Sequence, residues 1–96
     1  MVTHIVLFRL EDPSPENISS TAEILRSMEG QIPELKGIEV GINQRDTPNS
    51  HDIALVTRFE SWEDYDVYRA HPYHKDPVLK HMHAVAAGAA VADYEG

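Results

Sequence analysis

The sequence predicts an α+β fold in which helices cover one face of a four-stranded antiparallel sheet. Strand-like and helix-like segments alternate along the chain, the first strand is apolar on both faces, and Pro and Gly residues separate the segments. The 96 residues correspond to a single domain, residues 1–96. A chain of this size buries only about 60–65 % of its unfolded surface. Pairing with a second copy is a simple way to bury more.

The first segment, residues 2–10, is rich in β-branched and aromatic side chains and stops before Pro13, which is typical of a strand. One face of this strand carries Val2, His4, Val6, Phe8 and Leu10. The other face is also mainly apolar, and a strand buried on both faces needs a layer on each side. Helices of the same chain can supply one layer. We expect a partner subunit to supply the other.

A first helix is predicted to begin at Pro15, with Ser14 as its N-cap, and to stop near Gly30. Alternating apolar residues then predict two strands, one within residues 35–44 and one within residues 51–60. The polar loop between these two strands contains Pro and Asn.

A second helix is predicted to begin after Ser61 and to end before Pro72. A third helix is predicted at about residues 74–87, closed by Gly88, with a final strand over residues 89–95. The resulting order, β-α-β-β-α-(α)-β, is the ferredoxin-like plan. Its sheet has one open face, and two such sheets packed face to face form a barrel.

The composition excludes several classes of function. Eight basic residues against 16 acidic ones leave a net charge of −8, which opposes binding to nucleic acid and to anionic membranes. The chain has no cysteine, which rules out disulfides, thiol catalysis and Cys-based zinc sites. We therefore expect a cytoplasmic protein with no nucleic-acid or membrane partner.

Five segments, taken in order, carry the pattern of a known family: His4-Ile5-Val6-Leu7-Phe8, residues 32–43, residues 52–56 with 59–61, Tyr68-Arg69-Ala70-His71-Pro72-Tyr73-His74, and Asp93-Tyr94-Glu95. Together they cover almost the whole chain and resemble the Dabb family of stress-responsive dimeric α+β barrel proteins. The resemblance implies a ferredoxin-like subunit and a homodimer in which the two sheets face each other.

The resemblance also implies candidate site residues. A plant branch of the family contains a polyketide cyclase in which the tyrosine and the last histidine of the Tyr-x-x-His-Pro-x-His segment act together. These correspond to Tyr68 and His74, and a pocket histidine of the first strand corresponds to His4. The sequence departs from the cyclase at Ile53, which replaces a pocket histidine. The shape of the pocket and the substrate therefore do not carry over.

We expect Tyr68 and His74 to be the catalytic pair if the protein is an enzyme, because histidine titrates near neutrality and can act as acid or base. The residues expected to line a ligand pocket are His4, Val6, Phe8, Leu25, Ile53, Leu55 and His71. Packing roles compete with this interpretation, since inward histidines and tyrosines are often hydrogen-bonded core residues. His71, next to Pro72, suits such a role.

No metal and no cofactor are expected. His71 and His74 are spaced by one helical turn, but Pro72 separates them, and there is no His-Glu-x-x-His pattern. Three functions remain open: binding of a small apolar or aromatic molecule between sheet and helices, carbonyl chemistry such as that of a polyketide cyclase with a Tyr–His pair, and a structural, stress-associated dimer without ligand. The related cofactor-free monooxygenases share the barrel plan and add oxygen-dependent chemistry as a further option.

Overall fold

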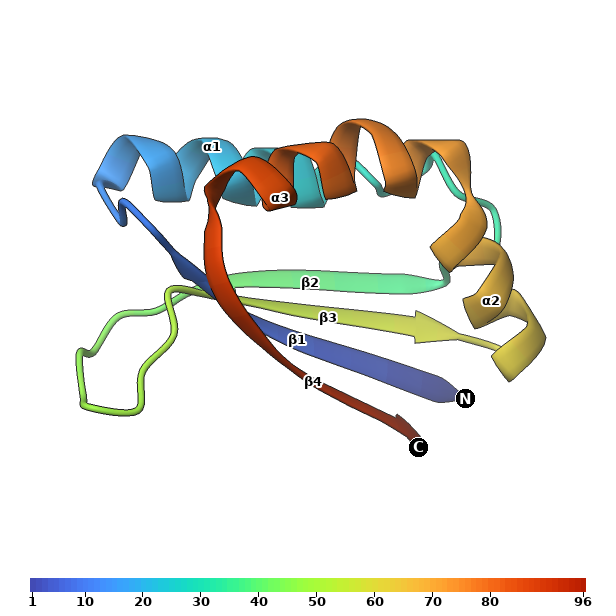
Figure 1. Cartoon of the computed structure of the whole chain (residues 1–96). Helices are drawn as coiled ribbons and strands as arrows, with labels where there is room; N and C mark the ends of the chain where they lie inside the picture. Colours follow the sequence, from blue (N-terminus) through green and yellow to red (C-terminus); the bar gives the residue numbers. More distant parts are fainter.

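Four strands form one antiparallel sheet in the order β2–β3–β1–β4, and the helices lie on one of its faces (Figure 1). The computed structural model describes all 96 residues. The elements along the chain are β1 (Val2–Leu10), α1 (Pro15–Arg26), β2 (Gly37–Ile42), β3 (Ile53–Phe59), α2 (Trp62–Ala70), the wide helical turn η1 (His74–Leu79), α3 (Lys80–Val85) and β4 (Ala86–Glu95). The predicted ferredoxin-like fold is confirmed.

Strand β1 lies inside the sheet, between β3 and β4. Its residue Val6 is opposite Leu55 of β3 and Val91 of β4, so these three side chains share the face that the helices cover. The alternation predicted for residues 2–10 is therefore the one observed. The neighbouring strands pair with both edges of β1, but the apolar face that points away from the helices has no covering layer within the single subunit.

Helix α1 begins as predicted and ends earlier. The Ser14 hydroxyl accepts a hydrogen bond of 3.2 Å from the backbone N–H of Asn17, and Pro15 occupies the first turn. The helix stops at Arg26 rather than near Gly30, and turns follow it. Gly30 has a φ of 81°, a left-handed conformation that favours glycine, so it belongs to the turn after the helix.

Helix α2 follows the predicted boundaries closely. The Ser61 hydroxyl accepts a hydrogen bond of 3.1 Å from the backbone N–H of Asp64. The helix ends at Ala70, and His71 then adopts an extended conformation before Pro72. The chain changes direction at this point.

The prediction of one continuous third helix at residues 74–87 was wrong. Asp76 interrupts it with φ −151° and ψ 109°, because a residue that precedes proline, here Pro77, avoids the helical region. The second part, α3, ends at Val85, and β4 begins at Ala86. Gly88 does not close a helix, since it lies within β4 opposite Arg9.

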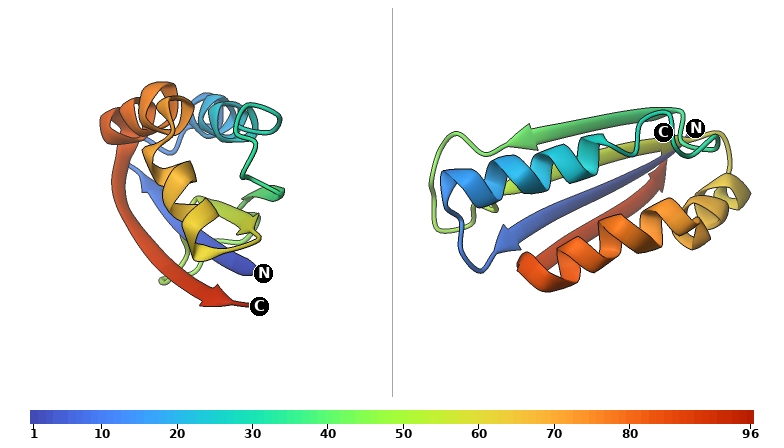
Figure 2. Two further views of the ribbon diagram at one scale, coloured as in Figure 1. Left: turned by 90° about the vertical axis from the view of Figure 1, so that its right-hand side faces the viewer. Right: turned by 90° about the horizontal axis from the view of Figure 1, so that it is seen from above.

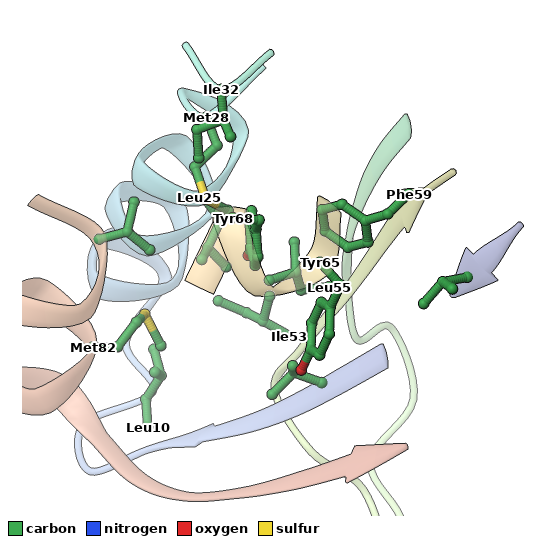
Figure 3. Packing of buried hydrophobic residues seen from close by; sticks show 13 residues of the cluster. Leu10, Leu25, Met28, Ile32, Ile53, Leu55, Phe59, Tyr65, Tyr68 and Met82 are labelled. Carbon is green, nitrogen blue, oxygen red and sulfur yellow. The ribbon is translucent and has the colours of Figure 1, made fainter. Parts of the chain in front are cut away.

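The core lies between the sheet and the helices. Figure 3 shows its side chains converging from α1 and the following turn, from α2, and from the strands. The largest fully buried side chains are Tyr68, Phe59, Leu25, Met28, Ile32 and Ile53. None of the helices combines the length and the hydrophobicity that a bilayer crossing requires.

The opposite face of the sheet carries no helix, as Figure 1 and the left view of Figure 2 show. The register places six apolar residues on this open face: Ile5, Leu7, Ala54, Val56, Ala90 and Ala92. Each of them is half-buried or exposed, and Leu7 is 37 % exposed. An apolar surface of this kind in the middle of a sheet is a marker of an interface.

Candidate functional site

A cavity of about 780 Å³ lies between the sheet and the segment that runs from α2 through η1 to α3. Twenty residues line it and 13 of these are hydrophobic, so its walls are mainly apolar. The charged and titratable side chains of the lining are His4, Tyr65, Asp66, Tyr68, Arg69, His74, Lys75, His83 and Asp93. Of these, His4, Tyr65 and Asp93 contact one another, and Tyr68 lies against His74. Binding sites for small molecules have this character: an apolar cavity of roughly 300–1,000 Å³ with a few convergent polar groups.

Tyr68 and His74 lie against each other on the helical side of the cavity. Their ring centroids are 4.4 Å apart and the rings are inclined by 43°. Tyr68 belongs to α2 and His74 begins η1. The extended His71 and the following Pro72 turn the chain between them, so two residues of separate helical segments meet.

The orientation of His74 leaves one ring nitrogen available. Its Nδ1 lies 3.1 Å from the carbonyl oxygen of Arg69, to which it donates its proton. Nε2 therefore carries no proton in the neutral ring, and it makes no hydrogen bond within the protein. Burial lowers the pKa of His74, and the hydrogen bond to Arg69 opposes this effect only in part. The imidazole is a neutral proton acceptor at pH 7.

Tyr68 has the opposite chemical character. Its side chain is 1 % exposed, and its hydroxyl is buried without any hydrogen-bond partner in the protein. Burial, followed by the nearby Tyr65, raises the pKa of Tyr68 far above that of free tyrosine. The hydroxyl therefore keeps its proton and remains a hydrogen-bond donor. A donor and an acceptor thus lie side by side in the cavity wall.

A second polar group joins β1, β4 and α2. His4 and Asp93 are opposite each other on neighbouring strands, and the Nδ1 of His4 contacts the Asp93 carboxylate. The Tyr65 hydroxyl lies 3.3 Å from Oδ2 of Asp93 and 3.3 Å from Nδ1 of His4. Burial and then the charge of Asp93 raise the pKa of Tyr65, so this hydroxyl also stays protonated and donates to the carboxylate.

The structure brings together most of the residues that the sequence suggested. Seven of the nine line the cavity: His4, Val6, Phe8, Leu25, Leu55, Tyr68 and His74. Ile53 and His71 do not. Ile53 is 1 % exposed and packs in the hydrophobic core. The Nδ1 of His71 accepts a hydrogen bond from the backbone N–H of Tyr73, so His71 shapes the turn after α2 instead of facing the cavity.

Sequence reasoning missed Asp93 and Tyr65. Asp93 lies on the same face of β4 as Val91, and the available signal was an acidic residue that follows Ala89 and Val91 on the inward face. Its partner could not be read from the sequence, because the register between β1 and β4 decides that Asp93 meets His4.

The chain is similar to other proteins along nearly its whole length. It is 30 % identical over 98 residues to an uncharacterised protein from Streptomyces coelicolor, and the match covers 99 % of each chain. A dimeric protein of unknown function with a ferredoxin-like fold, from Bacteroides fragilis, is 30 % identical, with a TM-score of 0.81 over 99 % of this chain and 95 % of that chain. A hydroxynitrile lyase from Passiflora edulis is 20 % identical, with a TM-score of 0.83 over 97 % of this chain and 90 % of that chain. The model of the stress-responsive A/B barrel domain, Dabb, matches residues 2–96, and the chain therefore belongs to the Dabb family.

Proposed function

We propose that the cavity binds a small, mainly apolar molecule, aromatic or aliphatic, that carries a carbonyl oxygen. The observation that supports this most directly is the buried Tyr68 hydroxyl without a partner in the wall of the cavity. A buried donor that lacks an acceptor costs about 1–3 kcal/mol. The hydroxyl is sealed from solvent in the ligand-free protein, so neighbouring side chains must shift before a ligand can reach it. A carbonyl oxygen that then accepts from Tyr68 would remove this cost and would fix the orientation of the molecule.

The apolar walls support the rest of the proposal. Val6 and Phe8 of β1, Leu55 of β3 and Leu25 of α1 contribute to them. Burial of apolar ligand surface against such walls stabilises a complex by roughly 25 cal/mol per Å². Affinity would come from this contact, and specificity from the few polar groups.

Two matched probes test the proposal. Acetophenone carries a carbonyl group, whereas ethylbenzene has a similar shape and no acceptor. We expect the protein to bind acetophenone more tightly by about 3- to 10-fold, the value of one hydrogen bond. Tyr68→Phe should abolish this preference and leave the affinity for ethylbenzene unchanged. Equal affinity of the wild-type protein for both probes would contradict the carbonyl assignment, and binding of neither would favour a structural dimer.

An enzymatic role is the second candidate, and the contact between Tyr68 and His74 favours it. In such a reaction Nε2 of His74 would take a proton from the carbon next to the ligand's carbonyl group, and the Tyr68 hydroxyl would donate a hydrogen bond to the enolate oxygen that forms. The protonated His74 would then return its proton to the product. The hydroxynitrile lyase from Passiflora edulis has the same fold, but at 20 % sequence identity only the fold can be compared, and not the reaction.

Exchange of the methyl protons of acetophenone in heavy water distinguishes catalysis from binding. An acid–base site should accelerate the exchange, typically by about 10²–10⁴-fold for one general base. The acceleration should disappear in His74→Gln. Binding of acetophenone without any acceleration of the exchange would leave the protein as a binding module.

We further propose that the protein is a homodimer formed through the open face of the sheet. The apolar residues on this face include Ile5 and Leu7 of β1 and Val56 of β3. The relative from Bacteroides fragilis, at 30 % identity, is described as dimeric. Packing the two open faces together would bury these residues and form a barrel.

A further inference from the structure

We infer that Asp93 is a positioning residue that holds the His4 imidazole with its Nε2 open to the cavity, so that the cavity contains a second proton acceptor besides His74. The inference deepens the proposed function, since it concerns the same cavity. It does not depend on the identity of the ligand, because the orientation and the proton of His4 are properties of the free protein.

The contact between His4 and Asp93 determines which nitrogen carries the proton. The Nδ1 of His4 meets the Asp93 carboxylate, and an ionised carboxylate accepts hydrogen bonds but cannot donate them. The proton of the neutral ring must therefore be on Nδ1. Nε2 is left as the acceptor, and it makes no hydrogen bond within the protein.

Nε2 is also accessible. His4 lines the cavity, and its side chain is 11 % exposed. The Tyr68 hydroxyl is the only side-chain polar atom that is both sealed from solvent and without a partner. Nε2 of His4 has no partner and is not among the sealed atoms, so it reaches open space at the cavity.

Tyr65 holds the carboxylate from the other side. Its hydroxyl is 3.3 Å from Oδ2 of Asp93, and its ring centroid is 5.0 Å from that of His4. The carboxylate therefore accepts from a phenol and from an imidazole, which restricts its rotation. An Asp93 orientation fixed in this way fixes the His4 ring in turn.

The resulting site has a definite order of groups. The centroid of Tyr68 lies 6.4 Å from that of His4 and 4.4 Å from that of His74. One hydrogen-bond donor is thus flanked by two nitrogen acceptors. A ligand that offers an acceptor to Tyr68 and a hydroxyl group or an acidic C–H to either histidine would match this order.

Nitrogen-15 NMR of the ligand-free protein tests the inference, because it distinguishes a protonated ring nitrogen from an unprotonated one. The spectra are recorded at alkaline pH, well above the usual pKa of about 6.5 for histidine, so that the rings are neutral. Signals of His4 are identified by their loss in His4→Gln. We expect the wild-type protein to have the proton on Nδ1 and an unprotonated Nε2.

Asp93→Asn should change this state. The Tyr65 hydroxyl donates to Asp93 and would hold the amide oxygen of the asparagine, so the amide NH₂ would face Nδ1, donate to it and favour the form with the proton on Nε2. Asp66→Asn is the matched control, since Asp66 also lines the cavity but makes no contact with His4. A wild-type His4 with its proton on Nε2 would overturn the inference, and so would a tautomer that is unchanged in Asp93→Asn or equally changed in Asp66→Asn. If Asp93→Asn fails to fold, the wild-type tautomer decides by itself.

These outcomes are separate from those of the proposed function. The protein can fail to bind acetophenone while His4 has its proton on Nδ1. It can also bind acetophenone while His4 has its proton on Nε2. If the contact between Asp93 and His4 served only to stabilise the fold, a change in the His4 tautomer would not alter any reaction in the cavity. Asp93→Asn should therefore also slow any exchange of acetophenone protons that the wild-type protein accelerates.

Discussion

The rings of Tyr68 and His74 have centroids 4.4 Å apart, although the residues are separated by a break in the helix. In an unbroken helix a separation of six residues corresponds to a rotation of about 600°, or about 240° after full turns are removed. The two side chains would then point to different sides. The turn at His71 and Pro72 is therefore what creates the pair.

Replacement of Tyr68 by Phe is predicted to make the free protein more stable. The variant removes a buried hydroxyl that has no partner, and we expect the free energy of unfolding to rise by about 1 kcal/mol. Urea denaturation measures this change. A gain in stability combined with a roughly 3- to 10-fold weaker affinity for acetophenone would be expected if the Tyr68 hydroxyl serves to bind a ligand.

Tyr73→Phe is the control for this variant. The Tyr73 hydroxyl donates a hydrogen bond of 2.8 Å to the Ser27 hydroxyl, so its removal should lower the free energy of unfolding by about 0.5–1 kcal/mol. If Tyr68→Phe destabilises the protein as much as Tyr73→Phe does, the Tyr68 hydroxyl has a partner in solution and the carbonyl proposal loses its main support.

His74 is predicted to make the protein less stable as the pH falls. The pKa of the folded state is below that of the unfolded chain, so between the two values the unfolded chain binds a proton that the folded protein does not. The contribution of His74 to stability is thus complete above about pH 6.5 and is lost as the pH falls through the lowered pKa. One proton contributes at most about 1.4 kcal/mol per pH unit, and solvent contact of the ring reduces this.

Comparison of the wild-type protein with His74→Gln isolates the effect. Between about pH 7 and about pH 5 the wild-type protein should lose more stability than the variant, as measured by urea denaturation at each pH. His51→Gln is the control, because His51 does not line the cavity. Parallel curves for wild-type and His74→Gln would show that His74 is not desolvated in the folded protein.

Val91→Phe is predicted to reduce ligand binding without loss of stability. Val91 lines the cavity from β4 and is 59 % exposed, so a larger ring fits the strand but occupies cavity volume. We expect the affinity for acetophenone to fall about tenfold or more and the free energy of unfolding to change by less than about 0.5 kcal/mol. Val67→Phe is the control, since Val67 is 47 % exposed on α2 and does not line the cavity. An equal effect of both variants would argue against this cavity as the binding site.

Leu7→Glu is predicted to convert the dimer to a monomer. Leu7 lies on the open face of β1, and an unpaired charge buried between two sheets costs several kcal/mol. Native mass spectrometry should show a dimer for the wild-type protein and a monomer for the variant. Val67→Glu, which changes an exposed residue of α2, should remain dimeric. A wild-type monomer, or a Leu7→Glu dimer, would contradict the sheet-to-sheet interface.

The fold was predictable where short-range rules decide the structure. The alternation in residues 2–10 predicted both faces of β1, and the Ser14 and Ser61 caps marked two helix starts. The rules failed where two local signals conflict. Apolar spacing favoured a helix through residues 74–87, but Asp76 before Pro77 breaks it, and the pairing of Gly88 with β1 extends β4 at the expense of α3.

The site was predictable only in part, for a physical reason. Inward positions on β1 follow from the period of two, which is why His4, Val6 and Phe8 were found. Whether an inward residue faces a cavity or solid core depends on the packing of distant elements, and this separates Leu55 from Ile53. The partner of His4 depends on strand register, which no local pattern of the sequence determines.

The polar and the apolar residues of the cavity wall come largely from different positions in the fold, and this affects how ligand specificity can evolve. The linked groups His4, Tyr65, Tyr68, His74 and Asp93 come from β1, α2, the start of η1 and one position of β4. Leu25 of α1, Met82 of α3 and Val91 of β4 contribute only apolar volume to the cavity wall. Substitutions among the bulky residues change the size of molecule that fits and leave the acid–base groups untouched. New specificities can therefore arise by drift at positions that carry no chemistry, with the reactive groups inherited unchanged.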